Sequence, residues 1–247
     1  CNKYWLPILI INPLQSSKHA KSKIRKVKSD PEDAFMLAVM LLTEPNLPQP
    51  VNMSLENART KLLQGQLASL EKQLQAIKQS YRQYQETFKD LGLEQTIAQQ
   101  ELQQVINELD RVRLALCKEL TGALKAQAKP EVVIKLKTLP GYSDVVAGLV
   151  GNLRMDVKSD QSWVAFVGLD VSTYQSGSWI GRGKLTKRGN AYIRKRLFQS
   201  AWGACLHYSY IRNYYDALKE KGRNHVEAVN IIARKLLRTA YQIVVNG

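Results

Sequence analysis

Residues 61–91, KLLQGQLASLEKQLQAIKQSYRQYQETFKDL, carry the pattern that determines the middle of the chain. Their apolar positions are separated by alternating steps of four and three residues, and they are Leu63, Leu67, Leu70, Leu74, Ile77, Tyr81, Tyr84, Phe88 and Leu91. A mean spacing of about 3.5 residues keeps these side chains on one face of a helix and is typical of a left-handed coiled coil. The stretch therefore predicts a long helix with a helical partner.

A second series with heptad spacing follows the break at Gly92. It consists of Leu102, Val105, Leu109, Val112 and Leu116. Two long helices separated by a glycine predict either an antiparallel helical hairpin or an arm that dimerises. Both alternatives describe architecture, and neither assigns any chemistry.

The charge of the chain indicates a polyanionic partner. Its 247 residues have a net charge of +15, with a pI of about 9.7. Such an excess favours nucleic acid first and an anionic membrane surface second. No run approaches the roughly 18 apolar residues of a membrane span, so we expect no membrane partner. The cysteines Cys1, Cys117 and Cys205 form no metal-binding spacing and indicate a reducing compartment.

The sequence in front of the heptads indicates an α/β segment. Residues 4–13 predict a strand that ends at an Asn-Pro turn, and residues 16–28 form a basic loop without acids. A helix is expected from residue 30, with Asp30 as its N-cap and Asp33 at the third helical position. These two acids stabilise the helix start, or they bind Mg²⁺, which prefers oxygen ligands.

Prolines divide the chain into three expected domains. Three prolines within residues 43–52 indicate one boundary, and Pro130 ends the heptad region. We therefore expect an α/β segment over 1–50, a coiled-coil region over 51–129 and a helical domain over 130–247.

Residues 174–196, YQSGSWIGRGKLTKRGNAYIRKR, combine exposed hydroxyls, glycines and a high density of positive charge. Seven Lys or Arg side chains lie in this stretch, and it has no acid. Basic side chains interleaved with aromatic ones are typical of nucleic-acid binding. Including the basic loop near the N-terminus, the candidate nucleic-acid contacts are Lys21, Lys23, Arg25, Lys26, Lys28, Arg182, Lys184, Lys187, Arg188, Arg194, Lys195 and Arg196.

The LPGYS turn at residues 139–143 is a further candidate for phosphate contact. It resembles a helix-hairpin-helix turn, whose backbone N–H groups bind a DNA phosphate, except that Ser143 stands where the second glycine is usual. The alternative is a plain corner between two helices.

Two segments resemble the DEDD transposases of bacterial insertion sequences, which are related to the pilin-gene invertases and include bridge-RNA-guided recombinases. SDPEDA at residues 29–34, after a basic loop and an INP turn, resembles the K-x-D-x-x-D-A signature of this family. SGSWIGRGKLTKRGNAYIRKRL at residues 176–197, preceded by LPGYS and VGLD, resembles its C-terminal half. The order and spacing of both segments fit the family, as does the heptad region between them.

The resemblance implies a resolvase-like, RNase H-like α/β nuclease fold at the front and an all-α transposase domain at the end. It implies a DNA transposase whose acids, here Asp30 and Asp33, bind Mg²⁺, and whose serine nucleophile is Ser176, with Ser178 as an alternative. DNA, a guide RNA and a homo-dimer or tetramer formed through the coiled coil are the implied partners. The implied location is the bacterial cytoplasm, at the nucleoid.

One departure from the family limits the expected activity of residues 1–247. The family's first Asp and its Glu fall upstream of Cys1, so the chain contains half of the carboxylate set. We expect it to bind nucleic acid with little strand transfer on its own. Two alternatives remain open: a basic coiled-coil protein that binds nucleic acid without catalysis, and a decayed transposase remnant.

Overall fold

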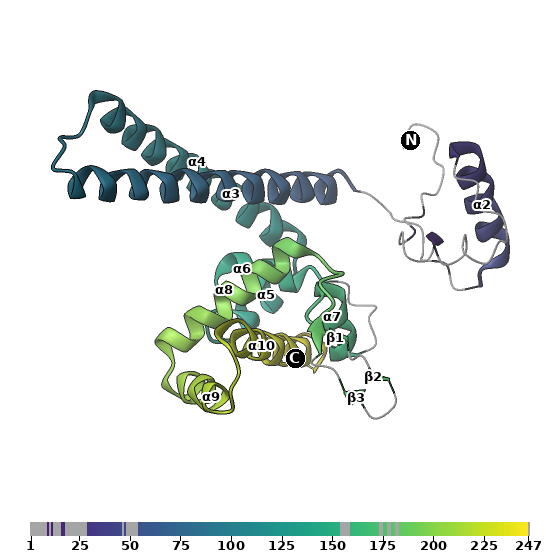
Figure 1. Cartoon of the computed structure of the whole chain (residues 1–247). Coiled ribbons are helices and arrows are strands. Elements are labelled where there is room, and N and C mark those ends of the chain that lie inside the picture. Colours follow the sequence, from purple (N-terminus) through teal and green to yellow (C-terminus); the bar gives the residue numbers. More distant parts are fainter. Residues whose placement is uncertain are drawn as a thin grey trace. The chain divides into compact units, whose positions relative to one another are not determined.

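The computed structural model describes residues 9, 11, 16–17, 29–45, 47, 54–153, 159–172, 175–176, 179–180 and 183–246. Of these, residues 175–176, 179–180 and 246 are described by their backbone alone. The chain divides into two units, Cys1–Asn57 and Ala58–Gly247. Figure 1 shows the helices and strands of both units.

The first unit contains helix α2, Asp30–Thr43. Its N-cap is Ser29 rather than Asp30, so the predicted cap position is wrong by one residue. Pro31 also lies one position later than expected, within the first turn, where its missing N–H group costs nothing. The predicted strand over 4–13 lies almost wholly outside the described residues, and the described part of the unit does not support the expected α/β fold.

Two long antiparallel helices, which we call the arm, begin the second unit. They are α3, Leu55–Asp90, and α4, Ile97–Gln127. Gly92 turns the chain between them with a φ of 66°, and Thr96 starts α4 with a capping box. An ion pair of 2.6 Å joins Arg59 to Glu119, near the ends of the arm that lie far from the turn. The hairpin alternative of the sequence analysis is therefore the one that the chain adopts within the described residues.

The first heptad series packs inward along most of α3. Leu63, Leu67, Leu74 and Tyr81 are buried, which confirms the predicted face. The series is exposed only near the turn, where Tyr84 is 59% and Leu91 is 66% exposed.

The predicted second series is correct only in part. Leu109 and Leu116 pack partly buried against the apolar clusters, whereas Val105 and Val112 are exposed and Ile106, rather than Val105, is buried against Leu74 and Tyr81. An α-helix turns about 100° per residue, so Val105 lies outside the face that contains Ile106 and Leu109. The cause is a polar group in the interface: Asp110 accepts hydrogen bonds from Lys78 of α3 and from Arg113. Because Asp110, Lys78 and Arg113 lie on the packed face, a search for apolar residues at heptad positions does not identify this face of α4.

Six helices and four very short strands form the rest of the described second unit, which we call the body. The helices are α5 (Pro130–Leu136), α6 (Asp144–Gly151), α7 (Asp160–Val167), α8 (Ala191–His207), α9 (Ser209–Glu220) and α10 (His225–Asn246). The strands are β1 (Val171–Ser172), β2 (Gln175–Ser176), β3 (Trp179–Ile180) and β4 (Lys184–Leu185). β1 pairs with β4, and β2 pairs with β3, both antiparallel. No described helix is long and apolar enough to cross a lipid bilayer.

A single apolar core joins the arm to the body. Leu67 and Leu120 at the base of the arm belong to the same cluster as Trp163, Leu197 and Leu237 of the body. α10 packs on α7, α8 and α9, as Figure 1 shows. The all-α prediction for the C-terminal region therefore holds except at the four short strands.

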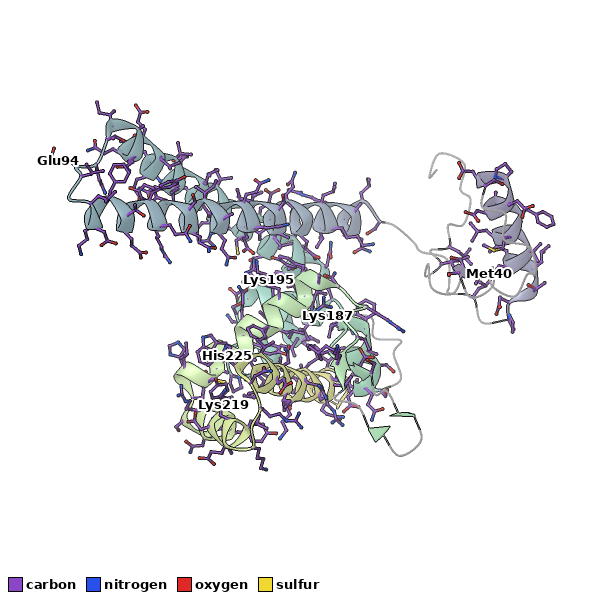
Figure 2. The ribbon with its side chains drawn as sticks, viewed as in Figure 1. Met40, Glu94, Lys187, Lys195, Lys219 and His225 are labelled. Atoms are coloured by element: carbon purple, nitrogen blue, oxygen red, sulfur yellow. The ribbon has the colours of Figure 1, made fainter. Side chains whose placement is uncertain are left out.

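An aromatic cluster holds the last three helices together. The His225 Nδ1 atom lies 2.9 Å from the Tyr215 hydroxyl oxygen. The ring of Trp202 stands edge-on to the His225 ring at 4.7 Å between centroids. Figure 2 shows His225 where α8, α9 and α10 meet. The chain breaks at Tyr208 into two helices, although the sequence favours one helical run from 190 to 222.

Glu71 of α3 attaches the arm to α8 through two cations. Lys195 Nζ donates to Glu71 Oε2 at 2.8 Å, and Arg196 Nη2 donates to Glu71 Oε1. The Glu71 side chain is only 10% exposed. Burial raises the pKa of this carboxyl, but the hydrogen bonds and charges of Lys195 and Arg196 outweigh burial, so the pKa lies below its ordinary 4.5.

We predict that Glu71→Gln destabilises the second unit in a pH-dependent way. The loss at pH 7 is expected to be about 2–3 kcal/mol, because Arg196 loses its charged partner while Lys195 can still reach water. Since the folded pKa is lowered, the ionised carboxylate stabilises the fold above its ordinary pKa, and this contribution disappears as the pH falls through the folded value. Urea unfolding followed by circular dichroism at pH 7 and pH 3 measures it.

Glu86→Gln is the matched control, because Glu86 lies exposed on the same helix. Its effect is expected to stay within about 0.5 kcal/mol at both pH values. Equal effects of the two substitutions at pH 7 would contradict the role of Glu71, as would a loss that persists undiminished at pH 3.

Candidate functional site

Asp30 and Asp33 lie together on the first turn of α2. Both side chains are exposed, and Asp33 donates its backbone N–H to the Ser29 carbonyl at 2.9 Å. At this position the two carboxylates can interact favourably with the positive end of the helix dipole, and they can also bind a cation. The structure therefore leaves both interpretations of the pair open.

Two carboxylates are too few for the Mg²⁺ sites of phosphoryl-transfer enzymes, which use additional oxygen ligands. Within the part of the chain that the structure describes, no group of three or more His, Cys, Asp or Glu side chains could hold a metal ion. The donor set around Asp30 and Asp33 is thus incomplete for Mg²⁺ in the described residues.

Ser176 lies in β2, where its backbone pairs with Trp179 of β3. The residue belongs to a loop that leaves the body after β1 and returns at β4. The alternative nucleophile Ser178 falls outside the described residues, as do the basic candidates Arg182, Lys21, Lys23, Arg25, Lys26 and Lys28.

Three of the predicted basic contacts are exposed where the loop returns to the body. Lys184, Lys187 and Arg188 all have exposed side chains. Lys187 has a φ of 53° and is the single non-glycine residue with positive φ in the described part of the chain. L-residues adopt this left-handed conformation rarely, so the fold holds the backbone of this return segment in an uncommon geometry.

The other three described candidates have partners inside the fold. Lys195 and Arg196 bind Glu71, and Arg194 Nη1 donates to the carbonyl oxygens of Val167 at 3.0 Å and Gly189 at 3.4 Å. Figure 2 shows Lys187 and Lys195 as separate positions on the body. The six described cations of this run are thus divided into three that are exposed and three that bond within the fold.

The LPGYS turn is tightly packed against α8. Gly141 has a φ of 76°, and a Cβ atom there would stand 2.2 Å from the Ser200 carbonyl oxygen. Ser143 caps α6, and its hydroxyl accepts from the Val146 N–H at 3.5 Å. Asp144 follows in the first turn of α6 and binds Lys137 at 2.7 Å. Lys125 also binds Asp144 at 3.1 Å, so the carboxylate at this helix start is paired with two cations. The close packing of Gly141 on α8 fits a corner between helices, and the phosphate contact stays a prediction.

A polar groove of about 650 Å³ lies between α3, α4 and α8, and sequence reasoning missed it. Its lining includes Lys78, Arg82 and Arg113 together with Gln75 and Gln79. These residues occupy polar positions of the heptad region, where a solvated face is the ordinary expectation. No sequence signal marks them, because the groove exists only where the arm meets α8.

The comparisons with known proteins agree with the resemblance of the C-terminal half. Residues 134–216 match the family model described as Transposase IS116/IS110/IS902 family. The comparison with curated proteins gave no match. The matched segment runs from α5 into α9, so it includes the LPGYS turn, the loop with Ser176, and α8. Over these residues the chain is similar to the transposases of the IS116/IS110/IS902 family, and the match supports an insertion-sequence transposase that acts on DNA.

Proposed function

We propose that this chain is the part of an insertion-sequence transposase that cleaves and joins DNA with Ser176 as its nucleophile. The observation that carries the proposal is that the family match spans a short-stranded loop which projects from the helical body and holds Ser176. Exposed cations at the return of this loop, Lys184, Lys187 and Arg188, give a DNA phosphate a place to bind.

The proposed reaction is an exchange of phosphodiester bonds. The Ser176 hydroxyl oxygen attacks a DNA phosphorus, so a serine–phosphorus ester forms and the bond from phosphorus to one deoxyribose oxygen breaks. The serine proton passes to solvent, and the released sugar oxygen takes up a proton. Attack on this ester by a sugar hydroxyl of a second DNA end joins the strands and restores serine. One phosphate ester replaces another, so the exchange needs no oxidant and no nucleotide cofactor.

Magnesium is the cofactor of the proposed reaction. It prefers oxygen ligands and offsets negative charge on a phosphate. Asp30 and Asp33 would supply two of its ligands, and the remaining carboxylates would come from outside the described residues. A guide RNA is the partner that we propose for the choice of DNA site, bound like DNA through its phosphates.

Ser176→Ala tests the nucleophile in the full-length protein. We expect recombination and the covalent protein–DNA adduct to disappear, because alanine has no attacking oxygen, while the affinity for DNA stays within about twofold. Denaturing gels with labelled DNA detect the adduct, and filter binding measures the affinity.

Ser178→Ala is the matched control in the same loop and is expected to keep the adduct. Recombination retained by Ser176→Ala would refute the proposed nucleophile. An unsubstituted protein that binds DNA without recombining it would instead favour a basic nucleic-acid-binding protein without catalysis or a decayed transposase.

Replacement of Lys184, Lys187 and Arg188 by Gln tests the phosphate contacts. Each lost contact with duplex DNA is expected to reduce the slope of log affinity against log salt by about 0.9, so the triple variant should lose about 2–3 in total. The matched control removes three exposed cations at the end of α9, namely Lys219, Lys221 and Arg223. Figure 2 shows Lys219 on the other side of the body from Lys187 in this view. An unchanged slope in the first variant would contradict the proposed contacts.

We also propose that a second copy of the chain packs on the outer face of α4. Three residues of the second heptad series, Leu102, Val105 and Val112, are 36%, 51% and 44% exposed on this face. Apolar side chains at heptad spacing on an exposed helix face are suited to another helix of the same kind. This assigns assembly to the arm without involving the interface between α3 and α4.

A double substitution, Val105→Glu with Val112→Glu, is expected to convert the protein to a monomer, because two buried charges oppose helix pairing. Light scattering after size-exclusion chromatography measures the mass. Val226→Glu with Val245→Glu is the control, since these valines of α10 are 55% and 53% exposed. A parent protein that is already monomeric, or an unaffected oligomer, would contradict this proposal.

A further inference from the structure

The two ends of the loop that contains Ser176 meet in a densely bonded segment, which we call the neck. It consists of residues 168–172, which leave α7, and residues 183–190, which lead into α8. The Thr186 N–H donates to the Asp170 carbonyl at 3.0 Å, and the Lys187 N–H donates to the Gly168 carbonyl at 3.3 Å. The pairing of β1 with β4 extends this ladder outward into the loop.

Side chains add three connections across the neck. The Thr186 hydroxyl donates to the Asp170 carboxylate. The Ser172 hydroxyl donates to the Lys184 carbonyl at 3.1 Å. The Arg194 guanidinium bonds the carbonyl oxygens of Val167 and Gly189, so α8 is joined to both ends of the loop at once.

The backbone at the neck is packed so closely that only glycine fits at one position. A Cβ atom at Gly189 would stand 2.1 Å from the Phe166 carbonyl oxygen. On the opposite side, Gly168 ends α7 with a φ of 72°. These contacts place the returning segment directly against the end of α7, and Arg194 closes over the junction.

The described outer part of the loop consists of the β2–β3 pair. It contains two residue pairs, and an isolated two-stranded hairpin is marginally stable in water. Ser176 follows Ser172 by four residues, so its backbone lies within roughly 14 Å of the neck, at about 3.5 Å per residue. Among the described residues, the neck attaches the loop with this serine to the body.

We propose that Asp170, Thr186 and Arg194 are positioning residues for Ser176, because they fix the neck from which the serine loop projects. This inference rests on the proposed function of Ser176 as nucleophile. It also gives Arg194 a role different from that of Lys184, Lys187 and Arg188. The Arg194 guanidinium donates to two backbone carbonyl oxygens and is not one of the proposed phosphate contacts. Misplacement of a reacting group by about 1 Å can reduce a rate by about a hundredfold, so a looser neck affects the rate before it affects binding.

The test compares Thr186→Val with Thr186→Ser in the full-length protein. Valine has nearly the same shape but no hydroxyl for Asp170, whereas serine keeps it. We expect Thr186→Val to slow formation of the covalent DNA adduct at least about tenfold, with the affinity for DNA and the melting temperature nearly unchanged. The Thr186→Ser variant is expected to form the adduct at the parental rate. Thr121→Val is the control, because the Thr121 hydroxyl bonds the Cys117 carbonyl within α4 at 2.7 Å.

Arg194→Lys is the second variant. It keeps the charge, but its side chain is one bond shorter than the path to Arg194 Nη1, the atom that donates to both carbonyl oxygens. If Thr186→Val does not fold, a slow Arg194→Lys variant with normal DNA affinity still supports the proposal. A parental rate of adduct formation in both Thr186→Val and Arg194→Lys would overturn the proposal. So would a Thr186→Ser variant that is as slow as Thr186→Val. An active Ser176→Ala variant would instead overturn the proposed function itself, so the two failures are distinguishable.

Discussion

The shared apolar core at the base of the arm is the constraint on which the rest of the second unit depends. Leu67, Leu120 and Leu124 are essentially inaccessible to solvent and lie in the same cluster as the body helices. Burial of three such side chains contributes several kcal/mol and makes the arm a continuation of the body. Because the base is fixed, Glu71 can meet Lys195 and Arg196, and the polar groove between α3, α4 and α8 takes its form.

Positive charge has two distinct uses in this protein. Cations with carboxylate or carbonyl partners, such as Arg194 and Arg196, hold helices together, whereas Lys184, Lys187 and Arg188 are exposed at the return of the loop. Only the second kind can offset phosphate charge without breaking the fold. A high net charge therefore indicates a polyanionic partner, but it overstates the number of side chains that contact it.

The transposase interpretation combines a family match with a local geometry. The match covers the helices on either side of the Ser176 loop, and the neck joins this loop to α7 and α8. A nucleophile on a projecting loop can reach a DNA backbone that a flat helical surface cannot approach. For Ser176 as the proposed nucleophile, a firm attachment at the base of the loop would limit the entropy lost when the serine is oriented for attack.

The sequence by itself determined the elements with strong local signals: a long helix over residues 61–91 with a helical partner, the break at Gly92, the helix start near residue 30, and the mainly helical C-terminal region. It also supplied the resemblance that points to Ser176, Asp30 and Asp33, whose roles stay predictions. Only the tertiary structure decided which face of α4 packs inward, since Asp110 and its two cations occupy an interface that apolar periodicity cannot identify. The tertiary structure also separated the exposed cations from Arg194, Lys195 and Arg196. A sequence shows the charge of these residues, but it does not show the carbonyl oxygens that Arg194 contacts, or that Glu71 of α3, 124 residues before Lys195, binds Lys195 and Arg196.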